Sequence, residues 1–371
     1  MDFLDSLLNQ TTNESTRRLV NVLEDIADKL EINSNFSIHH PDYKPYQISD
    51  DAVIHFQKMP ENIQQKYLGL RLRNFLYGIY YNGSMQSSLK LDSEEDYASP
   101  KFENKTFLGV DLEFYERLHQ SNFGKGYFEP GWHILKEEVD GSLAVNKKDL
   151  RLHIQRKKHL QPEHQAAAVG DYVAVKMPKN LVQNGFYVAV SNMGLYYPQS
   201  SKQQHVIVRV YFHLTRQGAV TVMASLTKHL NELAIPNYFK VLYNPQEYER
   251  YDCGVLYFDK RDWKALTEVL QIVHQENKSY FKAEIPLFAK YLAPGLALAE
   301  ESNKKFNSSE SFGMNRCQVI ANGLLAAWYR GNNSPSERIQ SILNHFSIAE
   351  IDLRHSYLNA DSEDIYTQLT V

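Results

Sequence analysis

The chain has 371 residues, of which 43% are hydrophobic and 23% are charged, and its formal net charge is −4 at pH 7. This length suggests about two domains, and the negative charge argues against nucleic acid as the main partner, because phosphate binding normally requires a basic excess. The two cysteines, Cys253 and Cys317, exclude a disulfide framework and favour a reducing compartment. The sequence shows neither a signal peptide nor an apolar run of about 20 residues that would span a bilayer. We therefore expect a cytoplasmic protein that does not bind membranes.

The first part of the chain predicts helices followed by short strands. Apolar residues recur at helical spacing within residues 1–35 and again from 61 to 80. The pair Asp140-Gly141, between two apolar runs, predicts a hairpin within a small meander over 132–155. We assign residues 1–165 to an N-terminal helical region with this meander, which would bind a peptide or a partner protein.

From Gly170 onward the pattern changes, and its clearest segment is a predicted strand over 205–214. This segment alternates strictly, with apolar residues on one side and Arg209, Tyr211 and His213 on the other. A guanidinium, a phenol and an imidazole in one row indicate a face over which something polar lies. A simple solvent-exposed face is the alternative, but Lys, Glu and Thr would be more typical of it.

The elements that follow this strand predict the fold class. An amphipathic helix over 218–233 precedes strands over 238–243 and 254–258. This order predicts an α+β fold, in which helices pack on one face of a central, largely antiparallel sheet and the other face forms a cleft. We assign residues 166–371 to this domain. Its C-terminal part is expected to be helical over 286–300, 315–330 and 335–346.

Basic residues concentrate on the strands and turns of this predicted sheet. The usual nucleophile and metal motifs are missing, so we expect neither a metal nor another cofactor. Several cations on one face are stabilised when a phosphomonoester dianion neutralises them. A further arginine is expected in the first turn of a helix that starts near Asn315, where free backbone N–H groups favour an anion. The residues of this predicted phosphate site are Lys176, Arg209, His213, Lys240, Arg250 and Arg316.

Two reactions of a phosphomonoester are open to such a site. Hydrolysis would need a metal, a cysteine loop or an aspartate pair, and the sequence indicates none of them. β-Elimination needs a base for the Cα proton, an acid for the leaving oxygen, and cations around the phosphate. Lys240, expected close to Arg209 and Arg250, is the best-placed base, because neighbouring cations can lower the pKa of a lysine. Tyr211 or His213 would be the acid.

Each of these residues, taken alone, has a simpler explanation. A lysine on a strand face, such as Lys240, is most often solvated, and the same holds for Arg250 in a polar turn. His213 alone would be a hydrogen-bonded histidine within a sheet. Only the joint placement of these residues favours a phosphate site over a solvated surface.

Several segments carry the most specific observation that the sequence offers. They are VRVYFHLT, GAVTVMASLTKHLNELAIPNYFKVLYNP, YERYDCGVLYF, SFGMNRC, LRNFLYGIYYNG, FEPGWHIL and PLFAKYLAPGLALAEE. These segments closely resemble the HopA family of bacterial type III effectors and its non-effector relatives, and the resemblance covers most of residues 60–330.

This resemblance implies an activity. Relatives occur as lyase subunits in lanthipeptide and thioamitide biosynthesis, where a separate kinase-like protein phosphorylates Ser or Thr of a ribosomally made precursor peptide. More distantly, the segment is similar to phosphothreonine lyases and to the lyase domains of class III lanthipeptide synthetases. The implied function is a cofactor-independent phospho-Ser/Thr lyase that yields dehydroalanine or dehydrobutyrine. The alternative is a non-catalytic, phosphopeptide-binding or effector-like interaction protein.

The resemblance also implies roles for individual residues. Lys240 falls on the base that removes the Cα proton, and Arg250 and Arg316 fall on the phosphate-binding arginines. A Lys-x-His pair of the more distant lyases becomes Arg209 and Tyr211 in this chain, so the acid is either this tyrosine or the nearby imidazole. Further candidates for the pocket are Lys176 and Tyr257.

Overall fold

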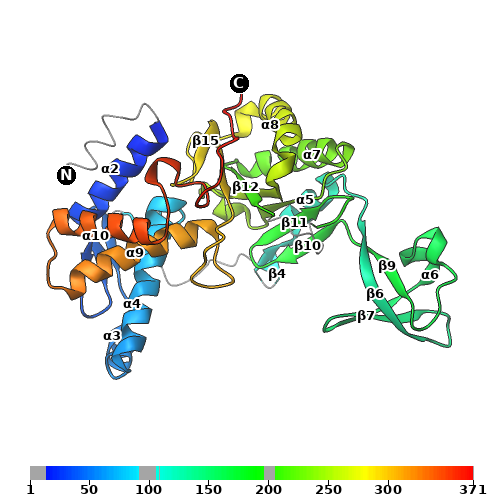
Figure 1. Cartoon of the computed structure of the whole chain (residues 1–371), viewed down its shortest axis with the longest axis horizontal. Coiled ribbons are helices and arrows are strands. Elements are labelled where there is room, and N and C mark those ends of the chain that lie inside the picture. Colours follow the sequence, from blue (N-terminus) through cyan, green and yellow to red (C-terminus); the bar gives the residue numbers. More distant parts are fainter. Residues whose placement is uncertain (1–13, 92–105, 108, 196–204, 371) are drawn as a thin grey trace.

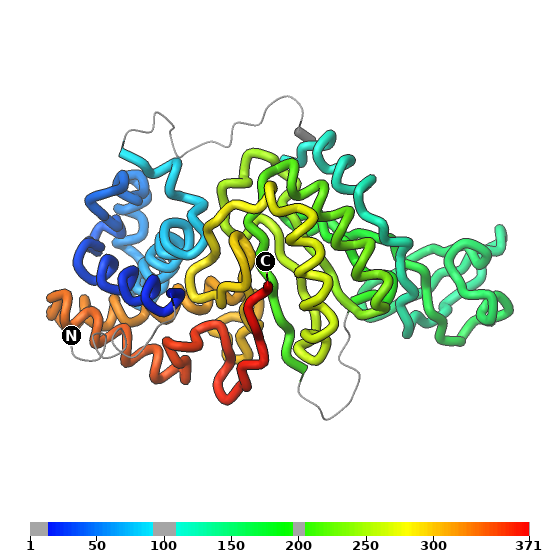
Figure 2. The backbone as a smooth tube through the Cα atoms, turned by 90° about the horizontal axis from the view of Figure 1, so that it is seen from above, coloured from blue at the N-terminus to red at the C-terminus, as the bar shows by residue number. Residues whose placement is uncertain are grey.

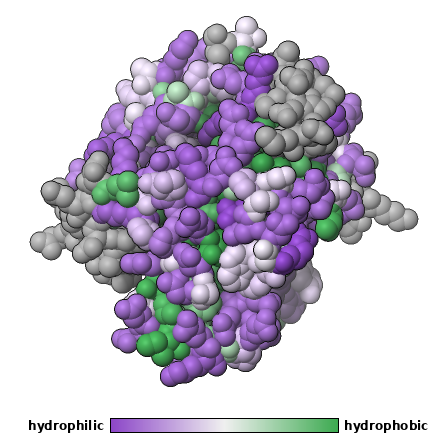
Figure 3. Space-filling model, turned by 90° about the vertical axis from the view of Figure 1, so that its left-hand side faces the viewer, coloured by the Kyte–Doolittle hydropathy of each residue, from purple (hydrophilic) through white to green (hydrophobic). Residues whose placement is uncertain are grey.

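The structure is a computed structural model, and it describes residues 14–91, 106–107, 109–195 and 205–370. Helices from both ends of the chain form one end of the molecule, a seven-stranded sheet with its own helices forms the middle, and a four-stranded sheet forms the other end (Figure 1). The helical end exposes a largely hydrophilic surface (Figure 3). In the described part of the chain, no helix has the length and apolar character needed to cross a membrane.

The central sheet has seven strands, and all neighbouring strands pair antiparallel. One face packs on α7 (Arg216–Glu232) and α8 (Trp263–Glu276), whose apolar residues share one core with the sheet. This arrangement confirms the predicted α+β fold. In spatial order the strands are β10 (Asn180–Gln183), β11 (Phe186–Val190), β13 (Tyr238–Leu242), β14 (Gly254–Asp259), β12 (Ile207–Phe212), β16 (Leu296–Glu300) and β15 (Lys290–Ala293).

The segment 286–300 is a β-hairpin, so the predicted helix there is wrong. β15 and β16 pair around Pro294 and Gly295 and form the edge of the sheet next to β12. The leucines and alanines of this segment favour helices as isolated residues. Every residue of β16 is buried, however, and burial between neighbouring strands outweighs the local preference.

Gly295→Ala should destabilise the protein much more than Gly141→Ala. Both glycines have a left-handed backbone, with φ of +66° and +77°. A Cβ atom at Gly295 would lie 2.2 Å from the carbonyl oxygen of Lys282, whereas one at Gly141 would meet nothing within 4 Å. We expect losses of unfolding free energy of about 3 and about 1 kcal/mol, measured by urea unfolding. Equal losses would contradict the close approach at Gly295.

The four-stranded sheet has its own small core and is ordered β8-β7-β6-β9. The predicted turn at Asp140-Gly141 is confirmed, because it joins β6 to β7. β9 pairs with β6, so the expected domain boundary at 165 falls inside this sheet. The elements are β6 (Tyr127–Glu137), β7 (Leu143–Lys147), β8 (Leu150–Ile154), β9 (Tyr172–Met177) and the short helix α6 (Arg156–His159).

The N-terminal helices continue into a π-helix that reaches the central sheet. The predicted helix over 61–80 is observed as α4 (Glu61–Leu76) followed by η1 (Tyr77–Tyr81). Of the helix predicted within 1–35, residues 1–13 lie outside the described residues. The other elements of this region are α2 (Glu14–Lys29), β1 (Glu31–Ile32), β2 (Ile38–His40), β3 (Tyr43–Tyr46), α3 (Asp50–Gln57), β4 (Thr106–Phe107), β5 (Val110–Asp111) and α5 (Leu112–Ser121).

The C-terminal helices lie beside the N-terminal ones (Figure 2). α9 (Phe312–Tyr329) starts earlier than predicted, because Ser311 caps it by accepting a hydrogen bond from the backbone N–H of Met314. Arg316 therefore lies in the second turn of this helix, whereas the sequence pattern placed it in the first turn. The other elements are α10 (Pro335–Ile348) and the 3₁₀ helices η2 (Pro162–His164), η3 (Pro245–Glu247), η4 (Lys260–Asp262), η5 (Lys278–Tyr280) and η6 (Leu353–His355).

Candidate functional site

Lys240 lies on β13, on the face of the central sheet opposite α7 and α8, and is half-buried. Its Nζ is 4.6 Å from the ring centroid of Phe186 on β11 and 5.1 Å from that of Tyr257 on β14. No carboxylate of the described residues forms an ion pair with this ammonium group. Aromatic rings on both neighbouring strands thus hold the lysine in place.

Arg209 contacts the same tyrosine ring from the neighbouring strand β12. The two residues are direct cross-strand partners, and the Arg209 Cζ is 5.0 Å from the Tyr257 ring centroid. Arg209 Nε donates a hydrogen bond to Glu301. Burial acts to raise the pKa of Glu301, but the charges and hydrogen bonds of Arg209 and Lys305 together outweigh it and lower that pKa. One tyrosine ring therefore contacts both the lysine and an arginine whose charge is balanced by a nearby acid.

Arg250 lies on the other side of Lys240, in the turn before β14. Its Cζ is 5.8 Å from the ring centroid of Phe186, which also contacts Lys240. Its Nε and Nη2 donate to the two carboxylate oxygens of Asp252, at 3.0 and 3.2 Å. This bidentate pair fixes the plane of the guanidinium group.

Asp252 receives two further hydrogen bonds from the N-terminal part of the chain. The hydroxyl of Tyr77 and the Nδ2 of Asn82 each donate to it at 3.1 Å. Burial acts to raise the pKa of Asp252, but the charge of Arg250 and these hydrogen bonds outweigh it and lower that pKa. The π-helix η1, which carries Tyr77, thus positions an arginine of the central sheet, in line with the frequent occurrence of π-helices at functional sites.

Tyr211, one of the two predicted acids, lies on the same face as Lys240 but is covered. Both residues pair with Val255, one on each side of β14. The ring of Tyr211 packs against Tyr81 of η1 and Phe312 of α9, with centroid distances of 6.4 and 6.5 Å. Burial raises the pKa of its hydroxyl. Tyr257 is buried as well, but its ring contacts Lys240 directly, and this contact makes it the better-placed phenol.

His213, the other predicted acid, lies beyond the end of β12. Its Nδ1 is 3.1 Å from the carbonyl oxygen of Glu284, and its ring packs against Tyr251 with a centroid distance of 5.2 Å. Burial lowers the pKa of this imidazole. None of the described contacts of His213 involves a residue that contacts Lys240. The structure therefore does not place this histidine in the group formed by Lys240 and the residues around it.

Two predicted phosphate ligands also lie outside the group. Arg316 is 2% exposed, and its Nε and Nη2 donate to the carbonyl oxygens of Ser356 and Leu358 at 2.9 and 3.0 Å. Burial lowers the pKa of Arg316 to about 10. Lys176 is exposed on β9, where it pairs with Phe128 of β6. It belongs to the four-stranded sheet, so its predicted place on the central sheet is wrong.

Sequence reasoning missed several residues that complete the group. Phe186 lies on β11, and the strand pairing that sets it beside Lys240 leaves no mark in the sequence. The Arg-x-Asp spacing of Arg250 and Asp252 was visible and could have indicated an ion pair. The contacts of Tyr77 and Asn82 join segments about 170 residues apart, for which one sequence offers no signal.

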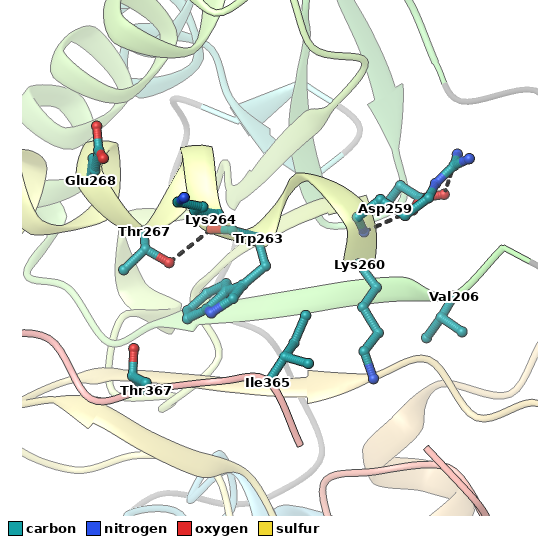
Figure 4. A pocket seen from close by; sticks show the side chains of 10 residues that line it. Val206, Asp259, Lys260, Trp263, Lys264, Thr267, Glu268, Ile365 and Thr367 are labelled. Atoms are coloured by element: carbon teal, nitrogen blue, oxygen red, sulfur yellow. Dashed lines mark hydrogen bonds and ion pairs between the residues drawn. The ribbon is translucent and has the colours of Figure 1, made fainter. Parts of the chain in front are cut away.

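A cavity of about 700 Å³ at the start of α8 is separate from this group (Figure 4). Lys260 extends toward the C-terminal segment that carries Ile365, and its Nζ pairs with Glu300 at 2.9 Å. Arg261 pairs with Asp259 at 2.8 Å. None of the residues predicted for the phosphate site lines this cavity.

The fold is an α+β fold whose central sheet carries Lys240, Tyr257 and Arg209 on one face, with Arg250 in the turn before β14. Residues 177–358 match the HopA1 effector protein family. The predicted family resemblance is thereby confirmed. The matched segment contains the four residues above but neither Tyr77 nor Asn82.

Two solved structures are similar to this chain. The effector protein from Pseudomonas syringae pv. tomato strain DC3000 is 17% identical, with a TM-score of 0.41 over 78% of this chain and 90% of that chain. The effector protein from Pseudomonas syringae pv. syringae strain 61 is 14% identical, with a TM-score of 0.42 over 84% of this chain and 99% of that chain. No curated protein matches the chain.

Proposed function

We propose that the chain is a lyase that removes phosphate from phosphoserine or phosphothreonine of a peptide by β-elimination, which leaves dehydroalanine or dehydrobutyrine. The supporting observation is Lys240, held between the rings of Phe186 and Tyr257 and flanked by Arg209 and Arg250. The peptide would be a ribosomally made precursor of lanthipeptide or thioamitide type, phosphorylated by a separate kinase-like protein.

In the proposed reaction Lys240, in its uncharged form, takes the Cα proton of the phosphorylated residue. The electrons of that C–H bond form the double bond between Cα and Cβ, and the Cβ–O bond breaks with its electrons going to the phosphate. The Tyr257 hydroxyl donates a proton to the leaving oxygen, since its ring contacts both Lys240 and Arg209. Return of a proton from Lys240 to Tyr257 restores both groups.

Arg209 and Arg250 would bind the phosphate oxygens. Arg209 pairs with Glu301, and Arg250 pairs with Asp252 and more distantly with Glu247. Each arginine also has N–H groups outside its hydrogen bonds to these acids. For the two Nη atoms of Arg209, no hydrogen-bond acceptor is found among the described residues. Nη1 of Arg250 is 3.7 Å from Glu247, beyond hydrogen-bond distance. These groups are the proposed donors to the phosphate dianion.

Mass spectrometry of a phosphoserine peptide incubated with the protein tests the proposal. Elimination lowers the mass by one phosphoric acid and yields a product that adds a thiol. A phosphatase would regenerate serine, which adds no thiol. Tight binding with unchanged mass would instead support a non-catalytic, phosphopeptide-binding or effector-like interaction protein, and either of these two results would overturn the lyase proposal.

A further inference from the structure

The four-stranded sheet has one covered face and one uncovered face. On the covered face, Trp132, Ile134 and Val173 belong to a buried core next to α6. Side chains alternate along each strand, so the remaining side chains of the same strands point away from this core. We call this second side the outer face, and the side chains that define it are Phe128, His133, Arg151, His153, Tyr172 and Lys176.

The strand register arranges these side chains in rows. Arg151, Asn146, His133 and Tyr172 are consecutive cross-strand partners from β8 to β9. The rings of His133 and Tyr172 lie against each other with a centroid distance of 5.0 Å. Tyr172 is nevertheless 71% exposed. An exposed tyrosine in a row with an arginine is typical of protein interfaces, in which both residue types are enriched.

The charge of the outer face differs from that of the whole chain. The outward-pointing positions of the strands hold no Asp or Glu, although the chain has a formal charge of −4. Within the described part of the chain, neither Arg151 nor Lys176 has an ion-pair partner. At the edge of the face, Lys136 is paired with Glu138 at 2.8 Å. The two unpaired cations are therefore available to acidic groups of another molecule.

We propose that the outer face binds an acidic peptide segment that also carries aromatic side chains. Its carboxylates pair with Arg151 and Lys176, and its aromatic side chains cover Tyr172 and Phe128. A nucleic acid fits this face less well, because two permanent cations release few counterions from a phosphate backbone. This surface is an interaction site in addition to the group around Lys240, and its test does not depend on elimination.

Fluorescence anisotropy with a labelled peptide of alternating Glu and Tyr tests the outer face. We expect wild-type protein to bind this peptide at least tenfold more tightly than a peptide of alternating Lys and Tyr, and to bind it less tightly as salt rises. The double variant Arg151→Glu/Lys176→Glu should weaken binding at least tenfold. Tyr172→Ala should weaken binding as well, without a change in charge.

The matched control is Lys66→Glu/Lys228→Glu, which changes the charge equally at exposed positions of α4 and α7. It should bind the Glu-Tyr peptide within about twofold of wild type, because neither position belongs to the outer face. Thermal unfolding followed by circular dichroism confirms that all variants are folded. Equal binding by the two double variants would overturn the proposal, as would tighter binding of a single-stranded oligonucleotide than of the peptide.

Discussion

Lys240→Ala should abolish the elimination of phosphate. Loss of a general base lowers a rate by about 10²- to 10⁴-fold, and no other described lysine contacts Phe186 or Tyr257. The measurement is the initial rate of dehydroalanine formation from a phosphoserine peptide. Lys228→Ala, on the exposed surface of α7, is the matched control and should retain the wild-type rate. Full activity of the Lys240 variant would contradict the proposed mechanism.

Lys240→Arg separates the role of a base from that of a cation. Arginine keeps the positive charge and the contacts with the aromatic rings, but it remains protonated at any working pH. We therefore expect this variant to bind the phosphopeptide but not to eliminate phosphate. Elimination at the wild-type rate would show that Lys240 acts only through its charge.

Asp252→Ala should reduce the free energy of unfolding by about 3 to 5 kcal/mol, because it removes the only carboxylate among the described residues that accepts hydrogen bonds from the largely buried Arg250. Arg250 would lose both of its hydrogen bonds to the carboxylate, and the donors on Tyr77 and Asn82 would lose their acceptor. Urea unfolding measures the loss. Asp352→Ala is the matched control, since Asp352 pairs with Arg354 on the surface and its removal should cost less than about 1 kcal/mol.

The ion pair between Asp252 and Arg250 makes a pH-dependent contribution to the free energy of unfolding. The pKa of Asp252 is lower in the folded protein than in the unfolded chain, where it is about 3.9. Its stabilisation is therefore complete above that value and is lost as the pH falls through the folded pKa. The difference in unfolding free energy between wild type and Asp252→Asn should narrow when the pH is lowered from about 5 to about 2. A difference that stays constant would contradict a charged Asp252.

The sequence was most informative where one pattern decided the structure. Strict alternation over 205–214 predicted β12, and the Asp140-Gly141 pair predicted the turn between β6 and β7. The prediction of a helix over 286–300 was wrong because a helix and a strand bury leucines and alanines equally well. The strand conformation is favoured because β16 pairs with the edge of β12, which would otherwise be unpaired.

The site was predictable in part for a similar reason. Lys240, Arg209 and Tyr257 lie on adjacent strands, and alternation sets the face on which each side chain lies. Their neighbours Phe186 and Glu301 depend on which strands pair and in which register, and alternation within one strand does not determine this. Lys176 alternates as regularly as Lys240, yet β9 pairs with β6 in a different sheet.

The π-helix η1 implies that the family segment 177–358 is not an autonomous module. Its Asp252 depends on Tyr77 and Asn82, and its buried Glu300 accepts hydrogen bonds from Ser362 and Tyr366. A fragment trimmed to the family match would lose donors to both acids. The geometry of the site therefore depends on the register of a helix outside the match. One residue inserted into α4 would rotate the tyrosines of η1 by about 100° about the helix axis. They would then lose their contacts with Asp252 and Tyr211.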